Sequence, residues 1–141
     1  MPGASRCETF AIPIEKIFDV IVDYAYYPKL LGEVDSVEII EQNETSALVK
    51  YNLQLIKTFS YVLRLEHERP HRVTWQLDSG DFFKSNNGSW TLTKEGDDRT
   101  KIDYEIDINF KIFAPKMITE KIVAHNLPKM MQAFYERALE I

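Results

Sequence analysis

The chain has 141 residues, of which 45% are hydrophobic and 12% aromatic, so we expect one folded domain over residues 1–141 and exclude a disordered chain. Its formal net charge of −5 argues against DNA as a partner, because a phosphate backbone would be repelled at long range. The lone cysteine, Cys7, cannot form an intrachain disulfide, and no stretch approaches the roughly 18 apolar residues of a membrane span. We therefore expect a cytoplasmic protein without a transmembrane segment.

The first part of the chain predicts one strand and two short helices. Residues 6–12 have the pattern of a strand, and Pro13 stands where a helix would begin. The apolar residues behind this proline recur at helical spacing: Ile14, Ile17, Phe18 and Ile21. Pro28 is tolerated only in the first turn of a helix, so we predict a second helix over about residues 28–31 that ends at Gly32.

The middle of the chain, from residue 34 to residue 110, alternates with a period of two and predicts about six antiparallel strands. The apolar positions of this pattern would share one face of a sheet. They include Val49, Tyr51, Leu53, Phe59, Tyr61, Leu63, Leu65, Val73, Trp75, Leu77, Trp90, Leu92, Ile102, Tyr104, Ile106 and Ile108.

The last segment, from Pro115 to Ile141, returns to a helical period. It predicts one helix of about 26 residues, kinked at Pro128 because the proline ring clashes with the carbonyl of Ala124. An antiparallel sheet must bury one apolar face, and only this helix is long enough to cover it. We predict an α+β fold in which a curved antiparallel sheet of about six or seven strands wraps around the C-terminal helix.

Three segments resemble one protein superfamily: IPIEKIFDVIVDYAYYPKLL, LDSGDFFKSNNGSWTL and NLPKMMQAFYERALE. In this order they are similar to the helix-grip fold of the START and birch-pollen-allergen (SRPBCC) superfamily. The likeness is greatest to its branch of coenzyme-Q-binding proteins, polyketide cyclases/dehydrases and ribosome-association toxins, and it spans about residues 5–140. Some quinone-binding members carry a proline after the turn glycine, where this chain has Asp81, which argues against quinone binding in particular.

The glycines of the second segment have a structural role in this interpretation. Gly80 would allow a turn or bulge, and Gly88 would let the sheet bend or a neighbour approach closely. Trp90 would then stand against the terminal helix, with Phe82 and Phe83 near the mouth of a cavity.

The resemblance implies a cavity between sheet and helix that receives an apolar ligand, with apolar walls for affinity and a few polar groups for orientation. Any single wall residue could equally be ordinary core, and it is the set as a whole that suggests a pocket. The predicted lining residues are Tyr51, Leu53, Tyr61, Leu63, Trp75, Phe83, Asn86, Trp90, Tyr104, Ile106, Ile118, Ile122 and His125.

Other candidate chemistries find little support in the sequence. The acidic residues Asp103, Glu105 and Asp107 alternate with apolar residues, so they would face solvent together. His67 and His71 flank a predicted turn and lack a third metal ligand. We predict no catalytic triad, no metal site and no cofactor.

Three functions remain open. We favour binding, and with it transport or presentation, of a hydrophobic small molecule such as a lipid, isoprenoid quinone or polyketide, which leaves transient membrane contact open. The second is a polyketide aromatase/cyclase, which needs at least two polar side chains converging in the cavity. The third is a ribosome-associated interaction protein, with a patch formed by Lys116, Lys121 and Lys129.

Overall fold

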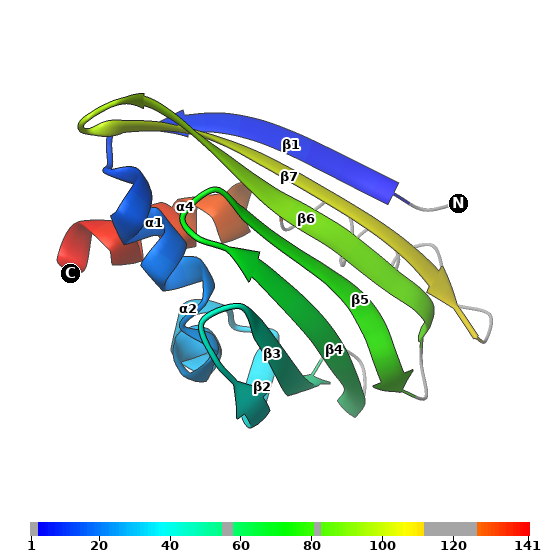
Figure 1. The fold of residues 1–141 in the computed structure, drawn as a ribbon. Coiled ribbons are helices and arrows are strands. Elements are labelled where there is room, and N and C mark those ends of the chain that lie inside the picture. Colours follow the sequence, from blue (N-terminus) through cyan, green and yellow to red (C-terminus); the bar gives the residue numbers. More distant parts are fainter. Residues whose placement is uncertain (1–2, 55–57, 81–82, 112–126) are drawn as a thin grey trace.

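The protein was analysed as a computed structural model (Figure 1), which describes residues 3–54, 58–80, 83–111 and 127–141. Its described helices are α1 (Ile14–Ile21), the 3₁₀ turn η1 (Tyr24–Tyr26), α2 (Tyr27–Leu30) and α4 (Leu127–Glu140). Its described strands are β1 (Gly3–Phe10), β2 (Val34–Gln42), β3 (Ser46–Gln54), β4 (Thr58–Glu68), β5 (Arg72–Gly80), β6 (Phe83–Gly96) and β7 (Arg99–Phe110).

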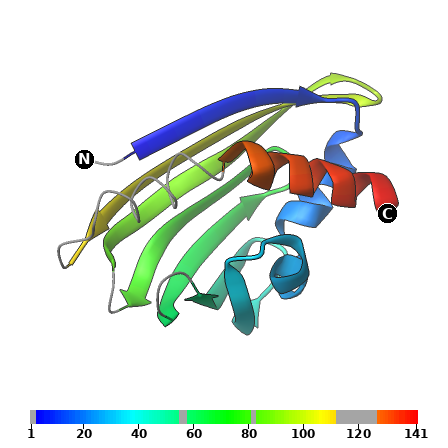
Figure 2. The same cartoon turned by 180° about the vertical axis from the view of Figure 1, so that it is seen from behind.

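The seven strands form one antiparallel sheet in the order β1-β7-β6-β5-β4-β3-β2. From β2 to β7, strands that are consecutive in the chain are neighbours in the sheet, and β1 pairs with the last strand, β7. Figure 1 shows the sheet strongly curved, and Figure 2, seen from behind, shows α4 lying across its concave side. The predicted α+β architecture, with a curved sheet gripping a C-terminal helix, is confirmed.

The two short N-terminal helices form where the sequence predicts them. Pro13 caps α1, and the buried side chains of that helix include the predicted apolar stripe. Pro28 lies in the first turn of α2, where its missing N–H costs no hydrogen bond. The two helices fill one end of the molecule beside the C-terminal half of α4 (Figure 2).

The helix α4 covers the sheet with one buried stripe, formed by Leu127, Met131, Phe134 and Ala138. The Phe134 ring lies 5.0 Å from the Trp90 ring, so the predicted contact of Trp90 with the terminal helix is confirmed. Residues 112–126, which hold the first half of the predicted helix, lie outside the described residues. The predicted kink at Pro128 therefore stays a prediction.

The predicted roles of the two glycines have structural counterparts. The pairing of β5 with β4 slips by one residue between Leu77 and Ser79, just before β5 ends at Gly80. A Cβ atom on Gly88 would lie 2.3 Å from the backbone oxygen of Glu105 and 2.5 Å from the Trp75 indole. Gly88 thus permits the close approach that the sequence predicts.

The sheet is split between its two central strands. The strands β5 and β6 are paired only from Arg72 opposite Thr91 to Trp75 opposite Gly88. Beyond that point β5 remains paired with β4, and β6 with β7. The two ribbons diverge toward the end of β5 in Figure 1.

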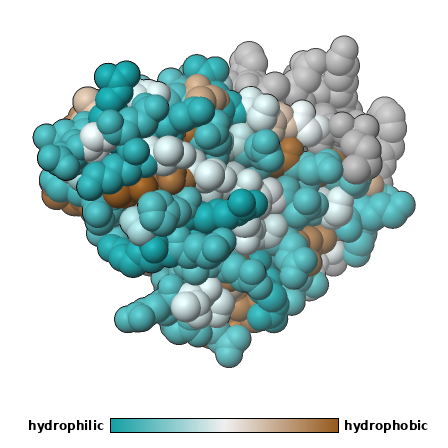
Figure 3. All heavy atoms as spheres, turned by 45° about the horizontal axis from the view of Figure 1, so that its top comes forward, coloured by the Kyte–Doolittle hydropathy of each residue, from teal (hydrophilic) through white to brown (hydrophobic). Residues whose placement is uncertain are grey.

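The described surface is mainly polar. Figure 3 shows apolar residues only as small separate patches on the face in view. The exposed large apolar side chains are Ile39, Ile40, Leu139 and Ile141. Among the described helices, none has the length and apolar character to cross a membrane.

Candidate functional site

Two cavities lie between the concave face of the sheet and the helices. The first, of about 140 Å³, is bordered mainly by tyrosines and tryptophans, and we call it the aromatic cavity. The second, of about 280 Å³, adjoins Lys129, Met130 and Ala133 of α4, and we call it the helix-side cavity. Seven residues line both: Leu31, Val34, Tyr61, Asn86, Tyr104, Ile106 and Met130. The two cavities are therefore parts of one hollow region.

The structure brings ten of the thirteen predicted lining residues to these cavities. Around the aromatic cavity are Tyr51, Tyr61, Leu63, Trp75, Asn86, Trp90, Tyr104 and Ile106. Around the helix-side cavity, in addition, are Leu53 and Phe83. The other three, Ile118, Ile122 and His125, lie outside the described residues. Whether the ten contact a ligand stays a prediction.

One predicted position differs in detail. Phe83 was expected near the cavity mouth, yet its side chain is only 1% exposed. It packs with Phe59 and Ile108 in a second apolar cluster, and a β-bulge follows it in β6. Phe82 lies outside the described residues.

Several residues that line the aromatic cavity were not predicted from the sequence. The aromatic cavity is also lined by Tyr27, Leu31, Val34, Leu65, Met130 and Phe134. Tyr27 lies in the first of the three resembling segments and Phe134 in the third, so both carried a signal. Met130 lies beside that stripe rather than on it, and no local pattern marked it as a wall residue.

The aromatic rings form contacts around the cavity. The Trp90 and Tyr104 ring centroids lie 4.7 Å apart in an edge-to-face arrangement, and Trp75 lies 5.6 Å from Tyr104. On the other wall, the rings of Tyr51 and Tyr61 stack at 5.4 Å. Such pairs fix one another, so the wall presents flat apolar surfaces in fixed orientations.

Polar groups accompany these rings. The hydroxyls of Tyr51, Tyr61 and Tyr104 make no hydrogen bond to any described residue. Burial raises the pKa of each phenol well above its usual value, so each remains protonated and can donate a hydrogen bond. Asn86, which is 4% exposed, accepts a hydrogen bond at its Oδ1 from the Trp75 indole nitrogen at 3.1 Å.

Two other tyrosines use their hydroxyls within the fold. Tyr27 donates to the backbone carbonyl of Ile21. Tyr24 lies 2.8 Å from Nε2 of His67, a buried contact that links η1 to the end of β4. Burial lowers the pKa of His67, although a hydrogen bond to the backbone of Glu44 opposes this shift. His67 lines neither cavity, and its neutral ring serves packing.

The acidic row of β7 lies on the outer face of the sheet, away from both cavities. Glu105 is exposed there, while Asp103 and Asp107 are half-buried. One oxygen of Asp107, Oδ1, is buried without a hydrogen-bond partner, so this residue is less solvated than the sequence suggests. Within the described ranges, no cluster of three His, Cys, Asp or Glu residues has a metal-binding arrangement.

The proposed basic patch is only partly described. Lys129 borders the helix-side cavity, whereas Lys116 and Lys121 lie outside the described residues.

A sequence profile for the family described as polyketide cyclase/dehydrase and lipid transport matches residues 10–135. The chain belongs to this family. Its match includes the two N-terminal helices, six of the seven strands and most of α4, so the resemblance inferred from the sequence is confirmed. No curated protein matches the chain by sequence.

Solved structures share the fold of this family member at low sequence identity. A protein of Thermus thermophilus superposes with a TM-score of 0.85 at 18% identity, covering 99% of this chain and 98% of its own. A START superfamily protein of Mycobacterium smegmatis gives 0.83 at 16% identity, with 98% and 97% covered. The Zhui aromatase/cyclase of Streptomyces sp. R1128 gives 0.70 at 16% identity, with 98% and 86% covered.

Proposed function

We propose that this protein binds a hydrophobic small molecule with a flat, unsaturated body and at least one carbonyl group. The observation that carries the proposal is that Tyr51, Tyr61 and Tyr104, whose hydroxyls have no described partner, line one cavity walled by aromatic rings. Rings favour stacking against a flat ligand. Neutral phenols donate to an acceptor such as a carbonyl oxygen, and this would fix the orientation of the bound molecule.

The cavity dimensions narrow the ligand class. Sites for drug-sized ligands usually enclose roughly 300–1,000 Å³, and the larger cavity here is about 280 Å³. A compact molecule of two or three fused rings, such as an aromatic polyketide, suits this space better than a long alkyl chain. Burying about 200 Å² of apolar ligand surface would contribute about 5 kcal/mol before the costs of association.

Two ligands with the same carbon skeleton test the proposal. Binding of 9,10-anthraquinone and of anthracene is measured by fluorescence quenching of the two tryptophans. We expect both to bind. The triple replacement Tyr51→Phe, Tyr61→Phe and Tyr104→Phe should weaken anthraquinone about tenfold, because each lost hydrogen bond contributes roughly 0.5–1.5 kcal/mol. Anthracene has no acceptor, so its affinity should not change.

Tyr135→Phe is the matched control, because this residue stacks on Phe10 at 4.4 Å and lines neither cavity. If neither ligand binds the wild-type protein, the proposed function is wrong. If the triple variant weakens both ligands equally, the hydroxyls do not orient the ligand.

A second candidate, an aromatase/cyclase, draws on the same polar groups. Phenols with raised pKa values could donate a proton or hydrogen bond to an enolate formed during ring closure. Incubation with a short linear poly-β-ketone, followed by mass spectrometry, distinguishes the two. Loss of water from the substrate at a rate that falls in the triple variant supports an enzyme, and unchanged recovery of substrate supports a binding protein.

A further inference from the structure

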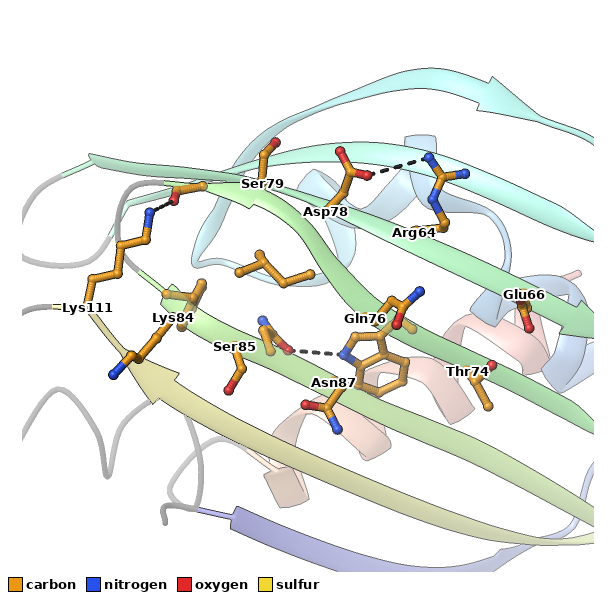
Figure 4. A pocket seen from close by; sticks show the side chains of 15 residues that line it. Arg64, Glu66, Thr74, Gln76, Asp78, Ser79, Lys84, Ser85, Asn87 and Lys111 are labelled. Carbon is orange, nitrogen blue, oxygen red and sulfur yellow. Dashed lines mark hydrogen bonds and ion pairs between the residues drawn. The ribbon is translucent and has the colours of Figure 1, made fainter.

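A polar groove of about 800 Å³ lies on the outer side of the sheet, over the split between β5 and β6. Figure 4 shows it with the side chains that surround it. Outward-facing residues of three strands form its sides, among them Arg64 of β4, Gln76 of β5 and Asn87 of β6. Beneath them lie residues of the inner face, which are visible through the split.

The split begins at a specific contact. The Trp75 indole lies against Gly88, where any Cβ would meet it at 2.5 Å. The indole nitrogen then donates to Asn86 Oδ1 at 3.1 Å, so a side-chain hydrogen bond joins the two strands where their backbone pairing has ended. Beyond this bond the strands part.

The same side chains separate the groove from the interior. Trp75 and Asn86 line both the groove and the aromatic cavity. Phe83 and Asn86 line both the groove and the helix-side cavity. One layer of side chains, joined by one hydrogen bond, is therefore all that lies between the outer groove and the hollow region.

Positive charge gathers at the wide end of the groove. In Figure 4, Lys84 and Lys111 lie at the same end with their side chains directed apart, while Glu66 lies toward the opposite, narrow end. The Lys111 ammonium donates to the backbone oxygen of Gly80 at 3.0 Å and keeps two further donors. Lys84 is the bulged residue of β6, and a bulge redirects a side chain out of the regular alternation. It forms no ion pair with any described residue.

The acidic groups of the groove leave this end positive. Asp78 is neutralised by Arg64, whose guanidinium lies 3.5 Å from its carboxylate. Between the ends, the groove offers neutral hydrogen-bonding groups on Gln76, Ser85 and Asn87. The wide end thus carries two lysines and no competing carboxylate from the described residues.

We propose that the split is an opening through the sheet, and that the groove holds the anionic head of an amphipathic ligand whose apolar body occupies the aromatic cavity. This inference rests on the proposed function and specifies the substrate class: a flat apolar body that carries a carboxylate, phosphate or sulfonate. Trp75 and Asn86 separate to let the junction between head and body pass.

Two fluorescent probes with the same body test the inference. They are 8-anilinonaphthalene-1-sulfonate and N-phenyl-1-naphthylamine, which lacks the sulfonate. In the full chain, the double variant Lys84→Ala, Lys111→Ala should bind the sulfonate about five- to tenfold more weakly. The uncharged probe should bind within twofold of wild type. The variant Lys84→Arg, Lys111→Arg should restore the sulfonate affinity, because the charge is kept.

Lys101→Ala is the matched control, because Lys101 lies on β7 and lines neither the groove nor either cavity. It should leave both probes unaffected. Lys129→Ala tests the rival position of the head, because Lys129 borders the helix-side cavity on the other side of the sheet. A loss of sulfonate binding in Lys129→Ala but not in the double variant would place the head beside α4 and overturn the inference.

The result also separates this inference from the proposed function. If the uncharged probe binds and the double variant does not affect the sulfonate, the proposed function stands and the role of the groove is wrong. If neither probe binds the wild-type protein, both are wrong.

Discussion

Replacing Gly88 with alanine should disturb the junction on which the split and the cavity depend. The added Cβ would lie 2.3 Å from the backbone oxygen of Glu105 and 2.5 Å from Cζ2 of Trp75. Neither neighbour can move aside without a cost in free energy. The oxygen belongs to β7, which is paired along its length with β6 and β1, and the indole is held by its hydrogen bond to Asn86.

The expected loss follows from two opposing terms. Overpacking of a well-packed site typically costs about 1–3 kcal/mol, and contacts this short place Gly88→Ala toward the upper end. The reduced entropy of the unfolded chain offsets about 0.4–1 kcal/mol. We expect a net loss of about 2 kcal/mol in the free energy of unfolding. With a urea m-value of roughly 2 kcal/mol/M, the unfolding midpoint should fall by about 1 M.

Urea unfolding followed by tryptophan fluorescence measures this loss directly. Gly32→Ala is the control, because a Cβ there meets nothing within 4 Å and no described glycine has a positive φ. It should leave the midpoint unchanged or slightly raised. A Gly88→Ala midpoint within about 0.2 M of wild type, or an equal fall in both variants, would refute the close-approach argument.

Two further predictions concern the helix and the buried histidine. Phe134→Ala should lower the free energy of unfolding in urea by about 3–5 kcal/mol, because this ring is 1% exposed and packs on Trp90. The control Leu139→Ala, at a side chain that is 56% exposed, should change that free energy by less than about 0.5 kcal/mol. Similar losses in both variants would count against burial of α4 by the sheet. Burial lowers the pKa of His67 in the folded state, so at acidic pH the unfolded chain binds a proton more readily than the folded chain. The contribution of the neutral ring to the free energy of unfolding should be complete above about pH 6.5. It should decrease as the pH falls from there through the folded-state pKa. Unfolding free energies measured from pH 8 to pH 5 should decline less steeply in His67→Gln, and parallel curves would exclude this origin.

The fold was largely readable from local periodicity. Alternation placed Tyr51, Tyr61 and Tyr104 on one face, because the side chains of a strand point alternately to opposite faces. The helical period of the last segment likewise predicted the terminal helix, and Phe134 lies on the buried stripe of α4. Those two patterns, together with one apolar sheet face that must be buried, were sufficient to predict the helix-grip architecture.

The cavity was readable only in part, because its shape depends on how elements meet. Met130 reaches the hollow region from α4, and Leu31 reaches it from the position directly after α2. Both positions depend on packing against the sheet rather than on any local period. The split between β5 and β6 could not be predicted from the sequence either, since the alternation of side chains continues along both strands whether or not they are paired. Gly88 signalled a close approach, but it could not reveal that the neighbour is Trp75.

The closure of β1 onto β7 has a consequence for how the chain is made. Gly3 pairs with Asp107 and Phe10 with Thr100, so the first strand finds its only neighbour near the other end of the polypeptide. Translation at about 5–20 residues per second leaves β1 waiting on the order of ten seconds for that neighbour. During this interval the hairpins from β2 onward can form in sequence, each from nearby residues. The strand β1 can therefore join the sheet only after β7 has been made.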